Sequence, residues 1–409
     1  MRFQNIGVGY SVTLSIMQNN IQKLYVTNFL TGFVFWYGIE KLFMRSIGIG
    51  AVGIAVNAIV YVLVSTIFNI PTGILADKWN RKYTLMIGIV ALGLSSFIMG
   101  HSHGLSTYLF ATAIWGLYVV FTSGTYQAMT YDSLAELDRE NEYVKQQGRS
   151  YGMFLVGVSL SSVIGGYIAS RYGYRSAYLL TIIPCILNLV VLASMHEPSF
   201  HKDTEGTKLW QHVKKTAKLV TGQQLLFYLA IMFVAATLLN SSQNEYSGLY
   251  FIALGFGAIG NGWANAGKWL FSSFGQFLSN RLGKLTKYLI PTFFIVFMIF
   301  TLYRSSLGLI FFYLATFLQS IIATNIEGVI QHNTPSSIRA TTLSLLGFVC
   351  SVILIPTYIA FGYIAKHNVF NAYSFIGIIG LVFMVVWLLR PKEVKKHKLY
   401  SITEPANIS

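Results

Sequence analysis

Charged residues are scarce in this chain of 409 amino acids, because Asp, Glu, Lys and Arg together make only 11% of it. Soluble domains carry roughly 25% charged residues, so this chain has too little charge to cover a surface that faces water. The hydrophobic fraction is 54% and the mean hydropathy is +0.57. This composition indicates an integral membrane protein, whose exterior lies against lipid.

Acidic residues are the rarer charged class, with 14 Asp and Glu against 29 Lys and Arg, which gives a formal net charge of +15. A basic excess often marks a nucleic-acid-binding protein, but here the basic residues lie in short segments between apolar runs. We therefore expect no nucleic acid as a partner. The expected partners are the lipid bilayer and a small-molecule substrate, and we expect a monomer.

Cysteine is nearly absent. Cys185 and Cys350 both fall inside apolar runs without the spacing of metal ligands, so neither a disulfide framework nor a metal site is expected. The chain also lacks a GxxxxGK[ST] phosphate-binding loop and any cluster of His, Asp and Glu typical of an enzyme. We therefore expect no enzymatic activity and no cofactor, with a proton gradient as the source of energy.

Long apolar runs are what the chain does contain, and a helix needs about 20 such residues to cross a bilayer. The sequence predicts an all-α membrane protein with twelve transmembrane helices, near 24–44, 49–75, 83–101, 106–131, 150–170, 176–195, 224–246, 250–279, 286–303, 307–331, 341–364 and 370–389. Most Lys and Arg residues then fall on the side that holds both termini. The positive-inside rule places that side in the cytoplasm, and we expect the cell (plasma) membrane.

The longest polar stretch, 196–222, divides the predicted spans into two sets of six. We expect a cytoplasmic N-terminal tail (1–22), a six-helix bundle (23–195), a cytoplasmic linker (196–222), a second six-helix bundle (223–390) and a cytoplasmic C-terminal tail (391–409). Two interpretations of the linker stay open. The lysines near 208–218, together with Leu209, Trp210 and Val213, suit a short amphipathic helix on the membrane surface, and they equally suit a solvated linker.

A cluster of acidic and basic residues follows the second span, in GILADKWNRKY (73–83). Asp77 can cap the next helix or meet the positive end of another helix. Asn80 tolerates the left-handed conformation that a tight turn needs. The stretch QFLSNRLGK (276–284) resembles this turn and holds the equivalent place in the second half, which is typical of a transporter built from two repeats.

These residues resemble the loop 2–3 signature of the major facilitator superfamily, G-x-L-A-D-x-x-x-R-K. The matching positions are Gly73, Leu75, Ala76, Asp77, Arg81 and Lys82. Asn80 departs from the pattern, since the family usually has Gly there. The predicted topology extends the resemblance over nearly the whole chain and implies two six-helix bundles that enclose a cavity.

The resemblance implies a latch at the inner gate. In the family the signature Arg pairs with an acid that ends the fourth span, here Asp132, and the signature Asp lies near the start of the eleventh span, here Arg339. The predicted inner-gate residues are Gly73, Asp77, Arg81, Lys82, Asp132 and Arg339.

Ionisable residues inside predicted spans are costly and indicate function. They are Glu40, Glu245, Lys268 and Glu327, on spans one, seven, eight and ten, and Asp132 ends span four. The resemblance implies that spans one, four, seven and ten line the cavity. Lys268 shares a helix face with Asn261, Asn265 and Ser272, and its expected partners are Glu327, Glu245 or an anionic substrate.

Glu327 ranks first for proton coupling, because burial and a nearby Lys act in opposite directions on a carboxyl group. Further polar candidates for the cavity are Asn28, Tyr126, Gln127, Asn240, Asn265 and Asn325. Four aromatic residues, Trp36, Tyr37, Trp115 and Tyr118, suit stacking on a lipophilic substrate, although Trp and Tyr also anchor membrane interfaces.

Span five contains GVSLSSVIGG, in which Gly157, Gly165 and Gly166 match a pattern of drug-exporting branches, while Ser161 and Ser162 replace its Gly-Pro pair. The missing Pro argues against a proton antiporter. The leading hypothesis is nevertheless proton-coupled efflux of drugs or small amphipathic compounds by alternating access. The alternative is proton-coupled uptake of a sugar, peptide or organic anion. A polytopic membrane enzyme or a channel is the remote alternative.

Overall fold

Every regular element that the structure describes is helical. The computed structural model describes residues 19–78, 80–198, 209–334, 339–392 and 394, and no strand occurs among them. Some side chains lie outside this description, namely those at 70–78, 144, 209–213, 215–216, 339–341 and 343. An all-helical chain satisfies its backbone hydrogen bonds within each segment, as a lipid environment demands.

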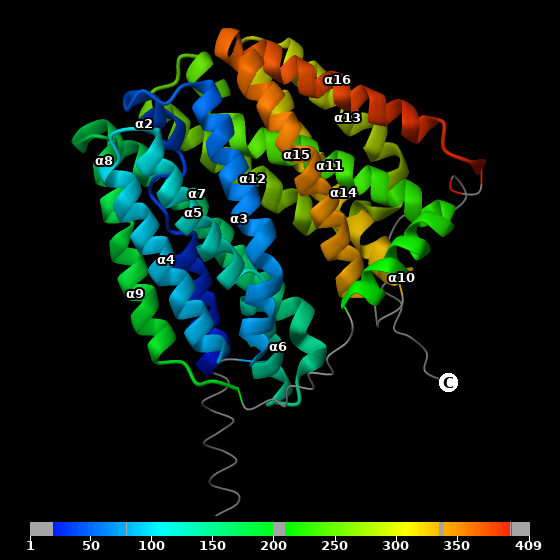
Figure 1. Cartoon of the computed structure of the whole chain (residues 1–409), viewed down its shortest axis with the longest axis horizontal. Helices are drawn as coiled ribbons and strands as arrows, with labels where there is room; N and C mark the ends of the chain where they lie inside the picture. Colours follow the sequence, from blue (N-terminus) through cyan, green and yellow to red (C-terminus); the bar gives the residue numbers. More distant parts are fainter. Residues whose placement is uncertain (1–18, 79, 199–208, 335–338, 393, 395–409) are drawn as a thin grey trace, which may run out of the picture. The chain divides into compact units, whose positions relative to one another are not determined.

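The contacts divide the chain into two units, Met1–Glu205 with Phe256–Trp269, and Gly206–Gly255 with Leu270–Ser409. The first unit contains a helix at 19–32, then α2 (Glu40–Ser46), α3 (Ala51–Lys78), α4 (Arg81–His101), α5 (Leu105–Thr122), α6 (Thr125–Ala135), η1 (Glu140–Glu142), α7 (Tyr143–Tyr172), α8 (Tyr174–Leu180) and α9 (Ile182–Ala193). In Figure 1, α4 and α9 run side by side, and α4 also packs against α5. The predicted bundle limits, 23–195 and 223–390, remain a prediction.

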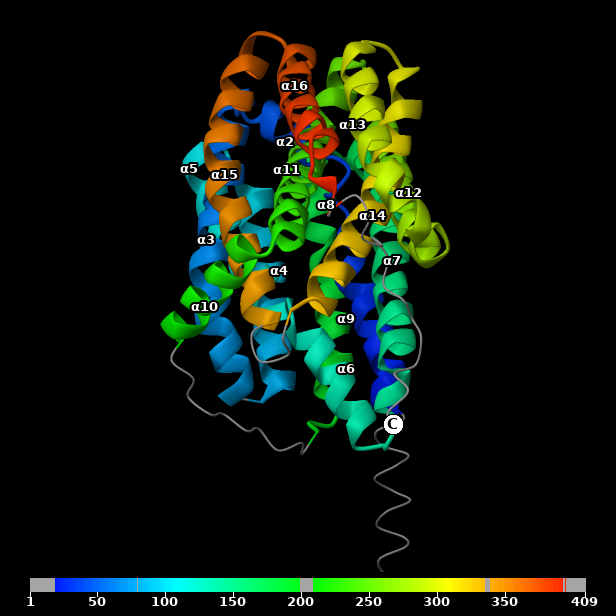
Figure 2. The ribbon, with the colours of Figure 1, turned by 90° about the vertical axis from the view of Figure 1, so that its right-hand side faces the viewer.

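The second unit contains α10 (Leu209–Gly222), α11 (Gln224–Ala253), η2 (Gly283–Leu285), α13 (Thr286–Leu302), α14 (Gly308–His332), α15 (Arg339–His367) and α16 (Val369–Leu388). Helix α12 (Ala258–Leu282) belongs to the first unit through Trp269 and to the second from Leu270. Figure 2 shows α15 beside α16, and α16 also packs on α11 and α13.

Ten stretches of the described residues are long and apolar enough to cross a membrane. They are Ala51–Asn69, Arg81–His101, Leu105–Ala135, Lys145–Tyr172, Tyr174–Ala193, Gln224–Ala253, Ala258–Leu302, Gly308–His332, Ser344–His367 and Val369–Leu388. The stretch Ala258–Leu302 contains both α12 and α13. The predicted first span is missing from these ten, because the helix at 19–32 and α2 are each too short to cross alone. The count of twelve remains a prediction.

The first predicted span is interrupted beside the junction of α8 and α9 in the sixth. The helix at 19–32 stops and α2 begins only at Glu40, while Thr181 separates α8 from α9. The backbone N–H of Phe35, which the first interruption frees, donates to Oγ1 of Thr181 (3.2 Å). Non-helical backbone is tolerated at membrane depth where protein groups satisfy it in this way.

Glycines let α7 lie directly against the interrupted first span. A Cβ atom on Gly165 would overlap the carbonyl oxygen of Phe35, and one on Gly157 would overlap that of Phe29. On the neighbouring face of α7, a Cβ on Gly166 would lie 2.7 Å from the carbonyl oxygen of Ala258. Small residues in α7 thus permit the close approach of the neighbouring backbone.

The core of the second unit is aromatic. Tyr250 packs edge to face on Phe300 (ring centroids 4.9 Å apart) and on Tyr373 (5.3 Å), and Phe300 also meets Phe312 (5.3 Å). All four side chains are buried. Such edge-to-face pairs contribute beyond the apolar area they bury, and they join α11, α13, α14 and α16.

Candidate functional site

Arg81 and Asp132 form an ion pair inside the first unit. Nη1 of Arg81 lies 2.6 Å from Oδ2 of Asp132, and the two side chains are 12% and 7% exposed. The pair joins the start of α4 to α6. Nε of Arg81 is buried and makes no hydrogen bond within the described residues, so the guanidinium keeps a donor for a second acceptor. The structure thus brings together the two residues that the resemblance pairs, and their role as a gate remains a prediction.

Two side chains cap the start of α4. Oδ1 of Asn80 accepts a hydrogen bond from the backbone N–H of Tyr83 (3.3 Å). The carboxylate of Glu197 accepts hydrogen bonds from the backbone N–H groups of Arg81 (2.7 Å) and Lys82 (2.8 Å). These N–H groups have no partner within the helix, and the positive helix end favours a carboxylate.

Asn80 does not use the left-handed conformation that it tolerates. Its backbone is extended, with φ −74° and ψ 123°, which is the conformation that a capping residue needs. The capping role of Glu197 was not predicted, because 116 positions separate this residue from Arg81. The available signal was an acidic residue directly after the sixth predicted span.

Hydrogen bonds hold the segment around Glu197 in place. Nζ of Lys82 donates to the carbonyl oxygens of Ala193 (2.6 Å) and Met195 (2.8 Å). Asn20 exchanges two hydrogen bonds with the backbone of His196 (2.8 and 3.0 Å). The starts of α4 and of the first span are therefore tied to the end of α9, and Lys82 is part of this network.

We expect Glu197→Gln to lower the free energy of unfolding by about 1–2 kcal/mol, because Gln carries no charge for the helix end and cannot accept both hydrogen bonds as a carboxylate does. The measurement is thermal unfolding in detergent, followed by the reaction of a fluorogenic thiol reagent with the buried Cys185 and Cys350. Glu140→Gln removes an exposed acid from η1 and serves as the control. Equal melting temperatures for the two variants would contradict the capping role.

Three predicted gate residues are described in their backbone alone. The backbones of Gly73 and Asp77 lie in α3, and Arg339 begins α15. Their proposed contacts therefore remain predictions.

Asn28 ties the first span to α7. Its Nδ2 atom donates to the carbonyl oxygen of Leu24 (3.0 Å) and to Oγ of Ser150 (2.8 Å). The side chain is half-buried. Asn28 therefore supports the packing of these helices as well as being a candidate for the cavity.

A ladder of polar side chains lies along the start of α7. The hydroxyl of Tyr25 donates to Gln146, whose Nε2 donates to Oε2 of Glu142 (2.8 Å). Arg139 donates to both oxygens of Glu142 (2.7 and 2.8 Å). The hydrogen bonds from Arg139 and Gln146 lower the pKa of Glu142 to about 2. Glu142 thus stays ionised at physiological pH. The stabilisation that its lowered pKa provides is present above pH 4.5 and is lost as the pH falls from there through about 2.

Glu40 belongs to a partly buried polar cluster. Nζ of Lys41 lies 3.0 Å from Oε2 of Glu40, with side chains 5% and 20% exposed. The hydroxyl of Tyr108 donates to Oε1 of Glu40 (3.4 Å) and lies 3.0 Å from the hydroxyl of Tyr178. Glu40 is therefore a partnered carboxylate at the start of α2.

The four predicted aromatic residues differ in burial: two are enclosed by protein, and two keep part of their surface exposed. Trp36 stacks on Tyr178 (ring centroids 5.2 Å apart), donates to Oγ of Ser96 (3.0 Å) and is 3% exposed. Tyr37 and Trp115 are half-exposed and meet edge to face at 5.6 Å. Protein contacts enclose Trp36, as they do the predicted Tyr118. Tyr37 and Trp115 are the two of the four rings that keep part of their surface exposed.

Gln127 lies exposed on α6, and Tyr131 is exposed one turn later. A spacing of four places both on one helix face. Polar side chains in a membrane span are stable against water or protein rather than against lipid. In contrast, the hydroxyl of the buried Tyr126 lies 2.8 Å from Oγ1 of Thr31, to which Asn188 donates (2.9 Å).

Lys268 is buried in the first unit, on the part of α12 that belongs to it. Its side chain is 4% exposed, and Nζ lies 5.0 Å from the ring centroid of Trp269. One turn earlier, Nδ2 of Asn265 donates to Oγ of Ser162 on α7 (2.9 Å). This face of α12 therefore packs on protein and does not face lipid.

In the second unit, α11 presents a polar stripe. The half-exposed residues of this stripe are Thr237, Asn240, Ser241, Asn244, Glu245 and Gly248. Nδ2 of Asn244 donates to Oδ1 of Asn240 (3.1 Å). The buried Gln243 points elsewhere and donates to Oγ1 of Thr316 (3.0 Å). So many accessible polar groups in one span favour a face that meets water or a polar ligand.

Glu327 lies half-exposed on α14. Its Oε1 atom accepts a hydrogen bond from Nε2 of Gln331, one turn later (3.0 Å). The predicted candidate Asn325 is buried and donates to the carbonyl oxygen of Ser279 (3.2 Å). Glu327 is thus an accessible carboxylate, whereas Asn325 joins α14 to α12.

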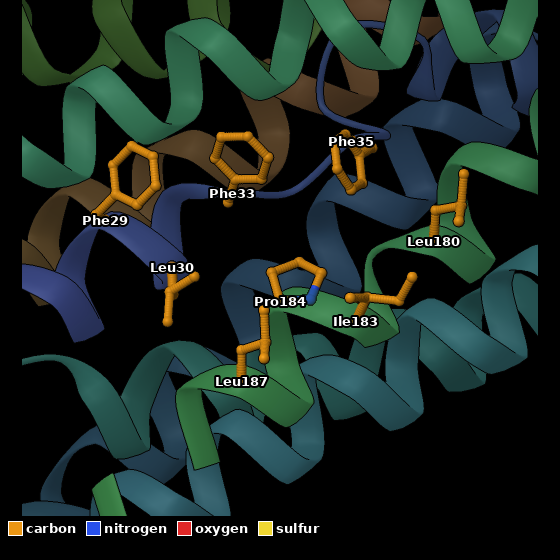
Figure 3. Close-up of a pocket in the computed structure, with 8 residues that line it drawn as sticks. All are labelled: Phe29, Leu30, Phe33, Phe35, Leu180, Ile183, Pro184 and Leu187. Carbon is orange, nitrogen blue, oxygen red and sulfur yellow. The ribbon is translucent and has the colours of Figure 1, made fainter. Parts of the chain in front are cut away.

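Figure 3 shows an apolar pocket of about 230 Å³ in the first unit, beside the interruption of the first span. Its lining side chains are Phe29, Leu30, Phe33, Phe35, Leu180, Ile183, Pro184 and Leu187. Ile183 and Leu187 are about half exposed at its rim (53% and 52%), which suits a surface that faces lipid. The pocket offers no side-chain polar group that could select a substrate.

Among the described residues, no three His, Cys, Asp or Glu side chains are grouped closely enough to hold a metal ion. The carboxylates of the spans instead lie singly, beside amides, hydroxyls or one basic residue. Such groups can bind polar ligands and can gain or lose protons.

Comparison with curated proteins finds distant relatives. An uncharacterized MFS-type transporter of Methanocaldococcus jannaschii is 22% identical over 393 residues, which cover 91% of this chain and 98% of the relative. An uncharacterized transporter of Buchnera aphidicola is 25% identical over 179 residues (43% of this chain, 44% of the relative). The quinolone resistance protein NorA of Staphylococcus aureus is 22% identical over 187 residues (44% and 46%). The matches to the last two span less than half of their length.

A solved structure of the peptide transporter POT in complex with sulfate has a similar fold. The TM-score is 0.72 at 14% sequence identity, and the match covers 93% of this chain and 96% of that chain. The family model of the Major Facilitator Superfamily matches residues 24–357. This chain, a multi-pass membrane transporter and not an enzyme, belongs to the major facilitator superfamily.

Proposed function

We propose that this transporter couples the efflux of drugs or small amphipathic compounds to proton entry, by alternating access. A proton gradient is the energy source, and the protein acts as a monomer in the plasma membrane with both termini in the cytoplasm. The inner gate consists of Gly73, Asp77, Arg81, Lys82, Asp132 and Arg339.

One observation carries the proton-coupled part of the proposal, namely the accessible carboxylate of Glu327 inside a membrane span. Its side chain is half-exposed and accepts a hydrogen bond from the neutral amide of Gln331 (3.0 Å). A carboxylate is costly in a membrane span, so one that occurs there indicates a function. A group that water and substrate can reach in turn can carry a proton across.

The accessible rings of Tyr37 and Trp115 support an amphipathic substrate, because their faces offer apolar contact and attract cations. The likeness to the quinolone resistance protein points the same way. Glu40, Asn28 and Gln127 add polar groups in the first unit, together with Lys268 and Asn265 of α12.

The polar stripe of α11 favours a second candidate, proton-coupled uptake of a sugar, peptide or organic anion. Asn240 and Asn244 offer amide donors and acceptors beside Glu245. Amides pair with hydroxyls and carboxylates, which amphipathic drugs carry in smaller number.

Everted membrane vesicles that contain the protein distinguish the two directions. Acidifying the vesicle lumen drives a cationic fluorescent dye inward if the protein is a proton antiporter. Under proton symport the same gradient drives substrate outward. Dye accumulation that stays at the level of empty vesicles, together with gradient-driven export of preloaded sugar, would replace the first proposal by the second.

We expect Glu327→Gln to abolish transport against a gradient and to keep substrate counterflow at zero proton gradient, because Gln resembles the protonated acid but releases no proton. Glu245→Gln is the matched control on α11. It should keep proton-driven transport and change the apparent affinity by about tenfold at most, because Gln replaces a hydrogen bond to a charged group by one to a neutral group. Full proton-driven transport by Glu327→Gln would contradict the assignment.

A further inference from the structure

Helix α10 joins neither the gate nor the carboxylates described above. It spans Leu209–Gly222 with the sequence LWQHVKKTAKLVTG, which contains three lysines and no acidic residue. The sequence by itself leaves open whether this stretch is a helix or a solvated linker. The structure shows a helix over Leu209–Gly222.

The helical periodicity sorts α10 into two faces. Leu209, Val213 and Val220 fall within one narrow arc, at spacings of four and seven residues. Lys214 and Lys218, one turn apart, fall on the opposite side and are exposed. Lys215 falls beside them in the helical projection. A helix with this division is suited to lie flat in the interface of a membrane.

The position of α10 in the chain holds it at the bilayer. Only Gln223, in an extended conformation, separates it from α11, whose membrane-spanning stretch begins at Gln224. Figure 2 shows α10 leaving α11 at an angle, and α10 also packs on α15 within the second unit. A single connecting residue cannot carry the helix away from the membrane surface.

We propose that the basic face of α10 binds the headgroups of anionic phospholipids. Charge complementarity favours this partner, because α10 carries three lysines and no acidic residue and is joined directly to the membrane-spanning α11. Basic residues near an anionic leaflet each add to the attraction, and salt screens it. This inference goes beyond the transported substrate and does not depend on it.

The test uses the full chain in a neutral detergent and short-chain lipids. Binding of dioctanoyl phosphatidylglycerol is measured by microscale thermophoresis beside dioctanoyl phosphatidylcholine and inorganic phosphate. We expect the anionic lipid to bind at least about tenfold more tightly than either. The triple variant Lys214→Gln/Lys215→Gln/Lys218→Gln should lose at least about tenfold in this affinity. Raised salt should likewise lower the affinity of the unaltered protein for the anionic lipid.

A matched control is Arg281→Gln/Lys284→Gln/Lys287→Gln, which removes the same charge from exposed positions around η2 and should keep the affinity. The Lys→Arg triple variant at 214, 215 and 218 should also keep it. If the Lys→Gln triple variant does not fold, the salt dependence and the Lys→Arg variant decide. Equal losses in test and control variants, equal binding of phosphatidylcholine, or equal binding of free phosphate would each overturn the proposal.

Discussion

An Asp132→Asn variant should insert in the membrane, lose most of its transport activity and lose about 3 kcal/mol or more of stability. The physical reason is the pair with Arg81, whose atoms lie 2.6 Å apart with both side chains nearly buried. Removing one partner leaves the other charge buried and uncompensated, which costs more than the pair itself contributes. Thermal unfolding measured by exposure of Cys185, together with dye transport in vesicles, measures both effects.

The double variant Arg81→Gln/Asp132→Asn separates stability from transport. With both charges removed, most of the lost stability should return, because no unpaired ion remains. Transport should stay low if the charges act in the gate. Recovery of both properties would show that the pair serves folding alone, whereas an unaltered melting temperature in Asp132→Asn would show that the pair is unimportant.

Gly165→Ala should sharply reduce the yield of folded protein, although it adds only one methyl group. A Cβ atom at this position would overlap the carbonyl oxygen of Phe35 in the interrupted first span. The neighbour is backbone and cannot rotate away, so we expect a loss of about 3 kcal/mol or more, at the upper end of overpacking effects. The yield of monodisperse protein and the melting temperature in detergent are the measurements.

Gly152→Ala on the same helix is the matched control. A Cβ at Gly152 has open space around it, and Ala is favoured over Gly inside a helix by about 0.5–1 kcal/mol. This variant should therefore be as stable as the original or slightly more so. A Gly165→Ala variant that melts together with Gly152→Ala would contradict the tight packing of α7 on the first span.

Some features of the site follow from sequence signals that are local. Arg81 was identified by a short motif, and its partner Asp132 by the resemblance, since both belong to a known pattern. Carboxylates in apolar spans, such as Glu40 and Glu327, are visible without any structure because their burial is costly. Gly157 and Gly165 are also visible in the sequence, as matches to a known pattern in span five.

Other features depend on residues that are distant in the chain. Glu197 caps α4 across 116 positions, and no local pattern marks such a partner. The anchoring of Trp36 by Tyr178 and Ser96 was also invisible, because a tryptophan in a span suits a substrate site and a core equally well. The extended, capping conformation of Asn80 was not predicted either, since the cap it forms depends on where the next helix begins.

The sequence alone determined that the chain is helical, membrane-spanning and related to a transporter family, because hydropathy and a short motif depend on neighbours along the chain. Only the tertiary structure decided that the first predicted span is interrupted where Phe35 donates a hydrogen bond to the sixth span, and that 196–222 contains a packed helix. It also decided which polar groups are accessible and which are enclosed. Burial and hydrogen-bond partners depend on which helices pack together, and the free energy of that packing belongs to the folded chain and not to any one segment.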